Sequence, residues 1–190
     1  MKRRGAGTLS RADIGTKVLL QAWVQRRRDH GGALFLDLRD RSGVAQVVAK
    51  PDQSAAALAA LDPVRSEWVV EVEGTVIARD AEAVNPKMAT GEVEVLAERA
   101  VVLSKSDPLP FAVDSRADVA EETRVKYRFL DLRRPELAKN FILRHEITHA
   151  VRGYFHEPGF LDLETPNLTK STPEGARDYL VPSRVPRGQS

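Results

Sequence analysis

The feature that most constrains the fold is a series of short alternating segments in the first hundred residues. In residues 33–40, three leucines share one face of an extended chain, whereas Phe35, Asp37 and Arg39 share the other. Five strands with one alanine-rich helix after the third follow the order of an OB-fold, a partly open Greek-key barrel, although other small barrels share this order. The predicted strands are 18–26, 33–40, 44–49, 68–78 and 91–103, and the predicted helix is 52–61.

The second half of the chain has a different pattern. Two prolines, three aspartates and three serines in residues 104–120 indicate a linker, and a basic helical stretch follows. Pro135 suits the first turn of a longer helix, which Pro158 and Gly159 would stop. The predicted elements are helices at 121–132 and 135–156 and a strand at 160–164. The predicted organisation is an OB-fold domain at 1–104, a linker or hinge at 105–140, and the start of a second domain at 141–190.

Composition narrows the classes of function. The chain has no cysteine, which excludes disulfides, thiolate zinc sites and cysteine nucleophiles. No apolar run has the length of a membrane span, and the charged N-terminus lacks the apolar stretch of a secretory signal, so the expected location is the cytoplasm. The formal net charge of +2 is weak evidence for a polyanionic partner. A nucleic-acid site must therefore be argued from where the charges lie.

One face of the predicted barrel has the chemistry of a nucleic-acid site. Phe35 shares its face with charged residues, where an aromatic ring can stack on an exposed base. The run from Arg26 through Arg28 to Asp29 ends the preceding strand beside that face, and arginines there can pair with phosphates or with a base edge. Gln46 and Glu94 fall on later strands and can read base edges through hydrogen bonds. The alternative is an isolated exposed phenylalanine among solvated arginines.

A second motif suggests a metal. His145, Glu146 and His149 spell H-E-x-x-H on the predicted helix, which is the zincin signature and places both histidines on one face. Gly153 and His156 follow, each one residue too late for the extended form of that pattern. Short motifs match by chance often, so the preferred interpretation is a set of exposed polar positions without a metal.

Several segments resemble a known family in order and with its spacing over essentially the whole chain. Residues 23–29, 35–40 and 88–95 look like the anticodon-binding domain of bacterial-type aspartyl-tRNA synthetases, which belong to class II. Residues 127–135 resemble the hinge of that family, and residues 159–166 resemble class II motif 1. Residues 172–182 resemble the mobile loop that closes over the amino acid. The chain is therefore similar to the N-terminal portion of such an enzyme.

The resemblance implies a fold and a set of roles. It implies an OB-fold followed by the start of a class II α/β catalytic domain, which is built on an antiparallel sheet. Phe35 would stack on the middle anticodon base, and Glu174 would contact the bound aspartate. Pro166 would lie at the interface of a homodimer. The expected contacts with anticodon bases come from Arg28, Gln46 and Glu94.

The implied reaction is the ATP-dependent attachment of aspartate to tRNA through an aspartyl-adenylate, with Mg²⁺ offsetting the phosphate charge. The ATP-binding motifs 2 and 3 of the family do not occur in these 190 residues. We therefore expect that residues for ATP and Mg²⁺ are mostly absent from this chain and that it cannot form the adenylate alone.

Two positions bear on the choice of tRNA. His30 matches a position where the residue resembles histidine in family members that charge both the aspartate and the asparagine tRNA. Ala83 aligns with a position where members restricted to the aspartate tRNA tend to carry asparagine. Both indicate the relaxed, non-discriminating type. An imidazole can donate or accept a hydrogen bond, so it can satisfy either base edge. The alternatives are a strictly tRNA(Asp)-specific ligase and a non-catalytic OB-fold module that binds tRNA.

Overall fold

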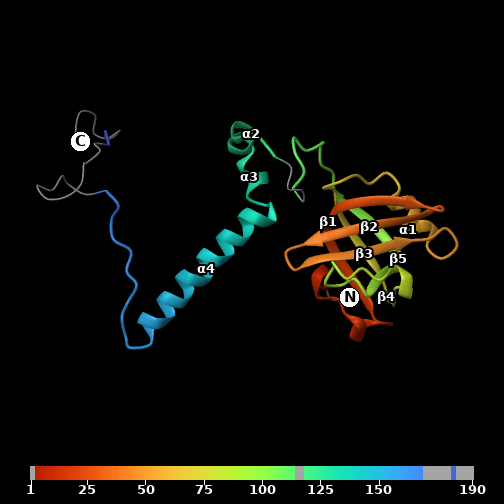
Figure 1. The fold of residues 1–190 in the computed structure, drawn as a ribbon, viewed down its shortest axis with the longest axis horizontal. Coiled ribbons are helices and arrows are strands. Elements are labelled where there is room, and N and C mark those ends of the chain that lie inside the picture. The colour runs from red at the N-terminus through yellow and green to blue at the C-terminus, as the bar shows by residue number, and fades with distance from the viewer. Residues whose placement is uncertain (1–2, 114–117, 169–180, 183–190) are drawn as a thin grey trace, which may run out of the picture. The chain divides into compact units, whose positions relative to one another are not determined.

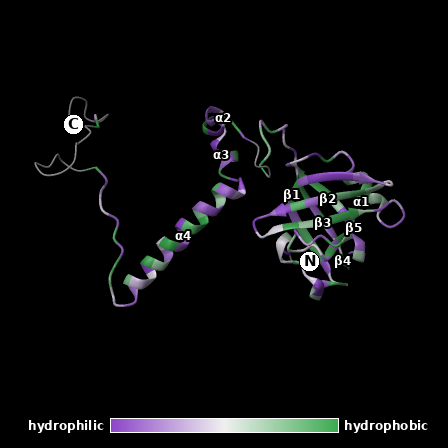
Figure 2. Cartoon of the chain, in the orientation of Figure 1, coloured by the Kyte–Doolittle hydropathy of each residue, from purple (hydrophilic) through white to green (hydrophobic). Residues whose placement is uncertain are grey.

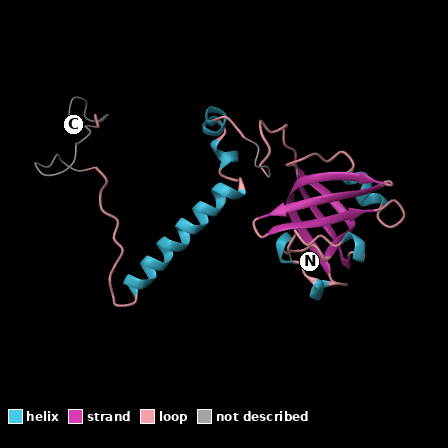
Figure 3. Cartoon of the chain, viewed as in Figure 1, coloured by secondary structure: helices cyan, strands magenta, loops and turns pink. Residues whose placement is uncertain are grey.

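The computed structural model describes residues 3–113, 118–168 and 181–182. The chain divides into two compact units, Met1–Pro135 and Glu136–Ser190, and each is described by itself. The first unit holds all the strands of the described residues, and the second is dominated by one long helix (Figures 1 and 3).

The first unit is built on a closed barrel with the strand order β1-β2-β3-β5-β4. The β3–β5 pair is parallel and the other four pairs are antiparallel. This topology, with one helix between the third and fourth strands, confirms the predicted OB-fold. The strands are β1 Lys17–His30, β2 Ala33–Asp40, β3 Gly43–Ala49, β4 Val69–Ala78 and β5 Val93–Ser104.

The alternating pattern of the sequence becomes the barrel core. Leu34, Leu36 and Leu38 are fully buried, whereas Phe35 and Arg39 on the opposite face are half-buried. A strand places successive side chains on opposite faces, so the period of two is what selects this arrangement. Valines of β3, β4 and β5 complete the same core.

Strand β1 is longer than the sequence predicts and pairs with two other strands. Its first half pairs with β4 up to Trp23, and its second half pairs with β2 as far as His30. A bulge between Val24 and Arg26 marks the change of partner, and bulges of this kind bend a strand. The last five residues of β1 are exposed. Hydrophobic and polar residues do not alternate in this part of β1, and the strand was therefore predicted to end at residue 26.

The helix α1 spans Ala55–Leu61 and contributes Ala57 and Leu61 to the barrel core. It begins three residues later than predicted, with Ser54 as the residue before its first turn. The Ser54 hydroxyl accepts a hydrogen bond from the Lys50 N–H at 2.7 Å, which closes a turn over residues 51–53. Short 3-10 helices lie at Ala6–Thr8 (η1), Arg11–Asp13 (η2) and Ala81–Ala83 (η3).

The connector, defined as residues 105–135, packs more closely than a plain linker. Phe111, Val113 and Leu130 form a small buried cluster of their own. The helix predicted at 121–132 is two short helices, α2 Glu121–Lys126 and α3 Arg128–Asp131. They separate at Tyr127, whose backbone leaves the helical region (φ −108°, ψ 44°).

The connector is also tied to the barrel by charged side chains. Arg133 lies over the Trp23 ring at 4.4 Å and reaches the Glu67 carboxylate at 3.6 Å. The same buried carboxylate accepts two hydrogen bonds from Arg39 of β2, at 3.0 and 2.8 Å. Burial lowers the pKa of the Arg133 guanidinium, an effect that the negative charge of Glu67 opposes. Charge pairing in a partly dry site thus joins these two parts of the first unit.

The second unit contains α4, Pro135–His156, with the bounds that the sequence predicts. Gly159, in a left-handed conformation (φ 100°), follows the helix and supplies the turn that ends it. The strand predicted at 160–164 is wrong: these residues are extended but unpaired, because no strand of the described residues lies beside them. Hydrophobic and hydrophilic residues alternate along α4, and its apolar side chains are exposed (Figure 2). None of the described helices is long and apolar enough to cross a membrane.

Candidate nucleic-acid interface

A hollow of about 520 Å³ lies on the outer face of the barrel, and three sheet strands contribute to it. The end of β1, the middle of β2 and β3, and the segment after β4 meet there. Its lining residues are Arg28, Asp29, His30, Phe35, Gln46, Arg79, Ala83 and Asn85. The hollow, so defined, gathers residues that are distant in sequence.

Phe35 occupies the hollow because of its strand register. It pairs with Arg28 of β1 on one side and with Val48 of β3 on the other. The alternation of β2 buries its neighbours Leu34 and Leu36 in the core and turns Phe35 to the outer face. Its side chain is half-buried, which leaves part of an aromatic surface open to a stacking partner.

A chain of hydrogen bonds fixes the polar side chains beside Phe35. Arg28 Nη2 donates to Asp37 Oδ1 at 2.7 Å and to Gln46 Oε1 at 3.1 Å. Gln46 Nε2 in turn donates to Glu94 Oε2 at 2.6 Å. Both of these contacts use Nη2 of Arg28, and a guanidinium carries five N–H donors. The network therefore orients Arg28 while leaving donors for a ligand.

Arg79 is the buried cation of the hollow. It is 8% exposed, and its Nε donates to the Val93 carbonyl at 3.0 Å. Burial lowers the pKa of the Arg79 guanidinium, whereas the nearby carboxylates of Glu94 and Asp37 raise it. An arginine remains charged under such shifts. The hollow thus places fixed positive charge close to groups that can read a base.

The loop that follows β4 carries Ala83 and Asn85 to the hollow. The Asn85 N–H donates to the Gly91 carbonyl at 3.1 Å, and the Gly91 N–H donates to the Met88 carbonyl at 2.9 Å. A Cβ on Gly91 would lie 1.9 Å from the Asn85 carbonyl oxygen. Only glycine fits this closed loop, which therefore sets where Asn85 and Ala83 lie.

The structure brings most of the predicted site residues together. Arg28, His30, Phe35, Gln46 and Ala83 all line the hollow, and Glu94 joins it through Gln46. Their contacts with RNA remain predictions.

Three further residues belong to the site although the sequence did not predict them: Asp37, Arg79 and Asn85. The strand alternation already placed Asp37 beside Phe35, and that signal could have identified it. The burial of Arg79 had no signal in the sequence, because an arginine at the end of a strand is usually solvated.

Two predicted residues belong to the second half of the chain. Glu174 lies outside the described residues. Pro166 is exposed in the extended segment that follows α4. Its place at a dimer interface remains a prediction.

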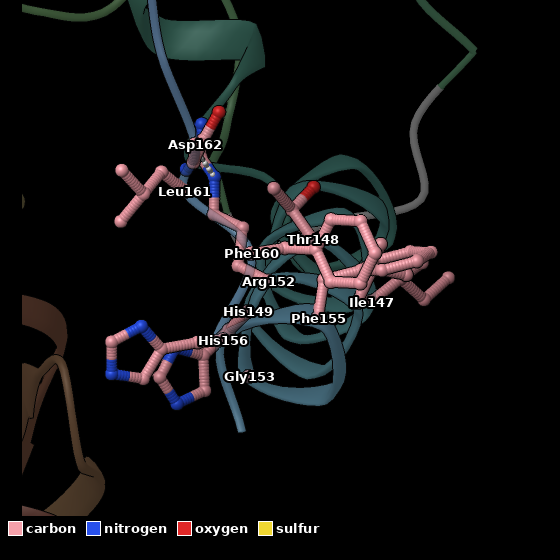
Figure 4. Close-up of a pocket in the computed structure, with 11 residues that line it drawn as sticks. Ile147, Thr148, His149, Arg152, Gly153, Phe155, His156, Phe160, Leu161 and Asp162 are labelled. Atoms are coloured by element: carbon pink, nitrogen blue, oxygen red, sulfur yellow. Dashed lines mark ion pairs between the residues drawn. The ribbon is translucent and has the colours of Figure 1, made fainter. Parts of the chain in front are cut away.

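The second unit has a depression of its own, with a volume of about 700 Å³, along α4 and the segment that follows it. Phe160 packs edge-on against Phe155 at 5.8 Å, and Arg152 pairs with Asp162 at 2.6 Å. Figure 4 shows His149 and His156 on one side of the helix and the phenylalanines on another.

The H-E-x-x-H motif lies on the exposed surface of α4. The rings of His145 and His149 are stacked at 6.2 Å between centroids. Across the described residues, no group of three or more histidines, cysteines or acidic residues is arranged to hold a metal ion.

Two family models match different parts of the chain. Residues 18–103 match the family described as OB-fold nucleic acid binding domain. Residues 120–189 match tRNA synthetases class II (D, K and N). The first match coincides with the barrel, and the second begins within the connector and continues through α4.

Individual proteins match over nearly the whole chain. An aspartate–tRNA ligase of Oceanobacillus iheyensis is 53% identical over 188 residues, which are 99% of this chain and 32% of that protein. An aspartate–tRNA(Asp/Asn) ligase of Desulfatibacillum aliphaticivorans is 53% identical over 98% of this chain and 31% of its own length. The chain thus spans about a third of the length of these curated relatives.

A solved structure supports the fold. Aspartyl tRNA synthetase from Entamoeba histolytica matches with a TM-score of 0.77 and 21% identity, over 89% of this chain and 40% of that one. The chain belongs to the family of bacterial aspartate–tRNA ligases, because it matches both family models and is more than 50% identical to such ligases over nearly its whole length.

Proposed function

We propose that this chain is the anticodon-recognising part of a ligase that attaches aspartate to tRNA. The observation that carries the proposal is the hollow, where Phe35, Arg28 and Gln46 meet on one face of a nucleic-acid-binding fold. Phe35 stacks on the middle anticodon base, and Arg28, Gln46 and Glu94 hydrogen-bond to base edges. The hydrogen-bond network holds these groups before RNA arrives, which lowers the entropy lost on binding.

The reaction itself would use ATP and Mg²⁺. The described residues hold no group of three or more histidines, cysteines or acidic residues that could bind a metal ion, and the family's ATP-binding motifs 2 and 3 do not occur in these 190 residues. We derive no step of the chemistry from this chain and assign RNA recognition to its barrel. The proposal includes domains at 1–104 and 141–190 joined by a hinge at 105–140, a cytoplasmic location, Glu174 at the aspartate and Pro166 at a homodimer interface.

Stacking on Phe35 is tested with an isolated anticodon stem-loop RNA. Phe35→Ala should weaken its binding to the 190-residue chain by about 1–3 kcal/mol, the usual loss for one base–aromatic stack. Phe129→Ala is the matched control, since Phe129 is 66% exposed on α3 and lines no part of the hollow. Equal affinities for the Phe35→Ala and Phe129→Ala variants, measured by fluorescence anisotropy, would contradict the assignment.

Relaxed tRNA specificity follows from the two lining residues His30 and Ala83. The aspartate and asparagine anticodons differ only in their third base, so discrimination depends on the groups around that base. The small Ala83 side chain makes no selective contact, and the exposed His30 imidazole can serve either base edge. We propose that the ligase aspartylates both tRNAs, and the asparagine tRNA then needs a separate amidotransferase.

The specificity proposal is tested with the ligase that contains this segment, by the rate of aspartylation of each purified tRNA. The wild type should charge both, and His30→Leu should lower the rate with the asparagine tRNA more than the rate with the aspartate tRNA. Ala83→Asn should act in the same direction. A wild-type enzyme that rejects the asparagine tRNA would show the strictly tRNA(Asp)-specific alternative to be correct.

A further inference from the structure

A second basic depression lies beside the hollow, at the edge of β1. Its volume is about 720 Å³, and its lining includes Arg26, Arg27, Asp62, Arg65 and Ser66. It forms where the pairing of β1 with β4 ends and the segment just before β4 hydrogen-bonds to β1 instead. The Glu67 N–H donates to the Val24 carbonyl at 2.7 Å, and the Val24 N–H donates to the Trp68 carbonyl at 2.9 Å.

The strand register connects this depression with the hollow. Arg26 pairs with Asp37, the residue that holds Arg28. Directly paired residues of antiparallel strands share a face, so Arg26 lies on the same face as the hollow. Arg26 and Arg28 are two residues apart on one strand, which separates their Cα atoms by about 7 Å. A chain bound in the hollow can therefore continue past Arg26.

Two of the cations in the depression, Arg26 and Arg65, have no counter-ion in the part of the chain that the structure describes. The side chains of Arg26 and Arg65 are exposed, and neither makes a hydrogen bond or ion pair with a described residue. Several other exposed cations of the barrel are neutralised: Arg4 by Asp13, Lys17 by Glu98 and Arg99 by Glu73. Arg27 is paired with Asp62 at 3.0 Å, but the side chain of Asp62 is 72% exposed, so this pair is weak.

The remaining polar group suits an anionic ligand. The Ser66 hydroxyl lies 3.5 Å from the Gln25 carbonyl, at the limit of a hydrogen bond, so it can turn toward a ligand. Guanidinium groups bind phosphate oxygens through paired N–H donors, and a hydroxyl adds one more donor. The aromatic surface needed to stack a base is absent from the lining of this depression. Its chemistry selects a phosphate and not a base.

We propose that Arg26, Arg65 and Ser66 form a phosphate groove that holds the RNA backbone next to the hollow, whatever the base sequence. This inference rests on the proposed function, because it takes RNA to be the ligand of the barrel. Contacts with phosphates fix the register of a nucleic acid, whereas base contacts read its sequence. The phosphate groove thus supplies affinity and position, and the hollow supplies discrimination.

The test measures how the affinity of the 190-residue chain depends on salt. Two RNAs are used, a stem-loop with an aspartate anticodon and the same stem with a scrambled loop. Arg26→Gln and Arg65→Gln should each lower the slope of log affinity against log salt by about 0.7 to 1, because one phosphate contact is lost. Each variant should lower the affinity for the two RNAs by the same factor. Arg41→Gln is the control, since Arg41 is an exposed arginine in the β2–β3 turn without a partner among the described residues.

Each outcome separates the two proposals. The phosphate groove would be overturned if the salt slopes of Arg26→Gln and Arg65→Gln equal that of Arg41→Gln. It would also be overturned if these variants lose affinity only for the RNA with the aspartate anticodon. Phe35→Ala should instead reduce the preference for that anticodon and leave the slope unchanged. A wild-type chain without any preference between the RNAs would overturn the proposed function, while the slopes would still decide the phosphate groove.

Discussion

Asp37 shows how a single residue can matter without touching a ligand. Its side chain is nearly buried, and it holds the guanidinium of Arg28, which is about half exposed. An arginine loses much rotational freedom when it is fixed by a ligand, and a partner that fixes it beforehand reduces that loss. The carboxylate also contributes to the negative charge around Arg79. Asp37 is therefore a positioning residue of the hollow.

We expect Asp37→Ala to weaken binding of the anticodon stem-loop by about 1 kcal/mol, the entropy cost of ordering one long side chain. Asp37→Asn keeps an acceptor at the same place and should recover part of the loss. Isothermal titration calorimetry with both variants makes the comparison. Asp37→Ala with wild-type affinity would show that Arg28 needs no such support.

At the scale of elements, the turn between β2 and β3 holds the N-terminal helix η1. Asp40 accepts hydrogen bonds from the Ala6 N–H at 2.8 Å and from the Ser42 N–H at 2.7 Å. Burial alone would raise the pKa of the Asp40 carboxyl. The hydrogen bonds from Ser42, Ala6 and Gly43 outweigh burial and hold that pKa below its ordinary value of 3.8. The ionised form of Asp40 is thus the form that the fold prefers.

A depressed pKa in the folded state makes stability depend on pH. The contribution of Asp40 is present above the ordinary pKa of 3.8 and is lost as the pH falls through the lower folded value. Asp40→Asn should therefore reduce the free energy of unfolding at pH 7, and the difference from the wild type should shrink at pH 3. Urea titrations followed by the fluorescence of Trp23 and Trp68, both in the barrel region, measure it.

Asp52→Asn serves as the control for this pH effect. Asp52 is exposed in the turn before α1 and makes no hydrogen bond with a described residue. Its replacement should leave the free energy of unfolding unchanged at both pH values. A difference between Asp40→Asn and the wild type that is the same at pH 3 and pH 7 would contradict the role of the ionised carboxylate.

The elements also show what the sequence can and cannot predict. Strand β2 was predicted with its observed bounds because its leucines alternate and a barrel core buries them. The predicted site residue on β2, Phe35, followed from the same alternation, and the family resemblance gave its role. The polar end of β1 was missed because its partner, not its composition, makes it a strand. The strand at 160–164 was wrong for the converse reason, since apolar alternation without a neighbour forms no ladder.

At the scale of the whole molecule, the barrel and the connector form one unit. Trp68 Nε1 donates to the Ser106 carbonyl at 3.0 Å, close to the point where the connector leaves β5. Glu67, which meets both Arg39 and Arg133, adopts a left-handed backbone (φ 64°) that a residue with a side chain rarely takes. The hollow and the phosphate groove take all their lining from this unit.

A fragment of residues 1–135 should therefore bind the anticodon stem-loop with the affinity of the 190-residue chain. A fragment of residues 1–104 should melt at a lower temperature, because the contacts of Arg133 with Trp23 and Glu67 are removed. Calorimetry and RNA binding on both fragments test this. A marked loss of affinity in the 1–135 fragment would place part of the interface in the second unit.

The order of the strands around the barrel also governs how quickly it can assemble. Leu20 of β1 pairs with Val72 of β4, and Val47 of β3 pairs with Val95 of β5. Strands near the N-terminus therefore pair with strands that are distant in sequence and synthesised later. Closing such long loops costs entropy before any contact offsets it, and folds of this kind reach the native state in milliseconds to seconds. During synthesis the three-stranded meander of β1, β2 and β3 emerges with unpaired edges. It stays exposed to other chains until residue 104 has been made.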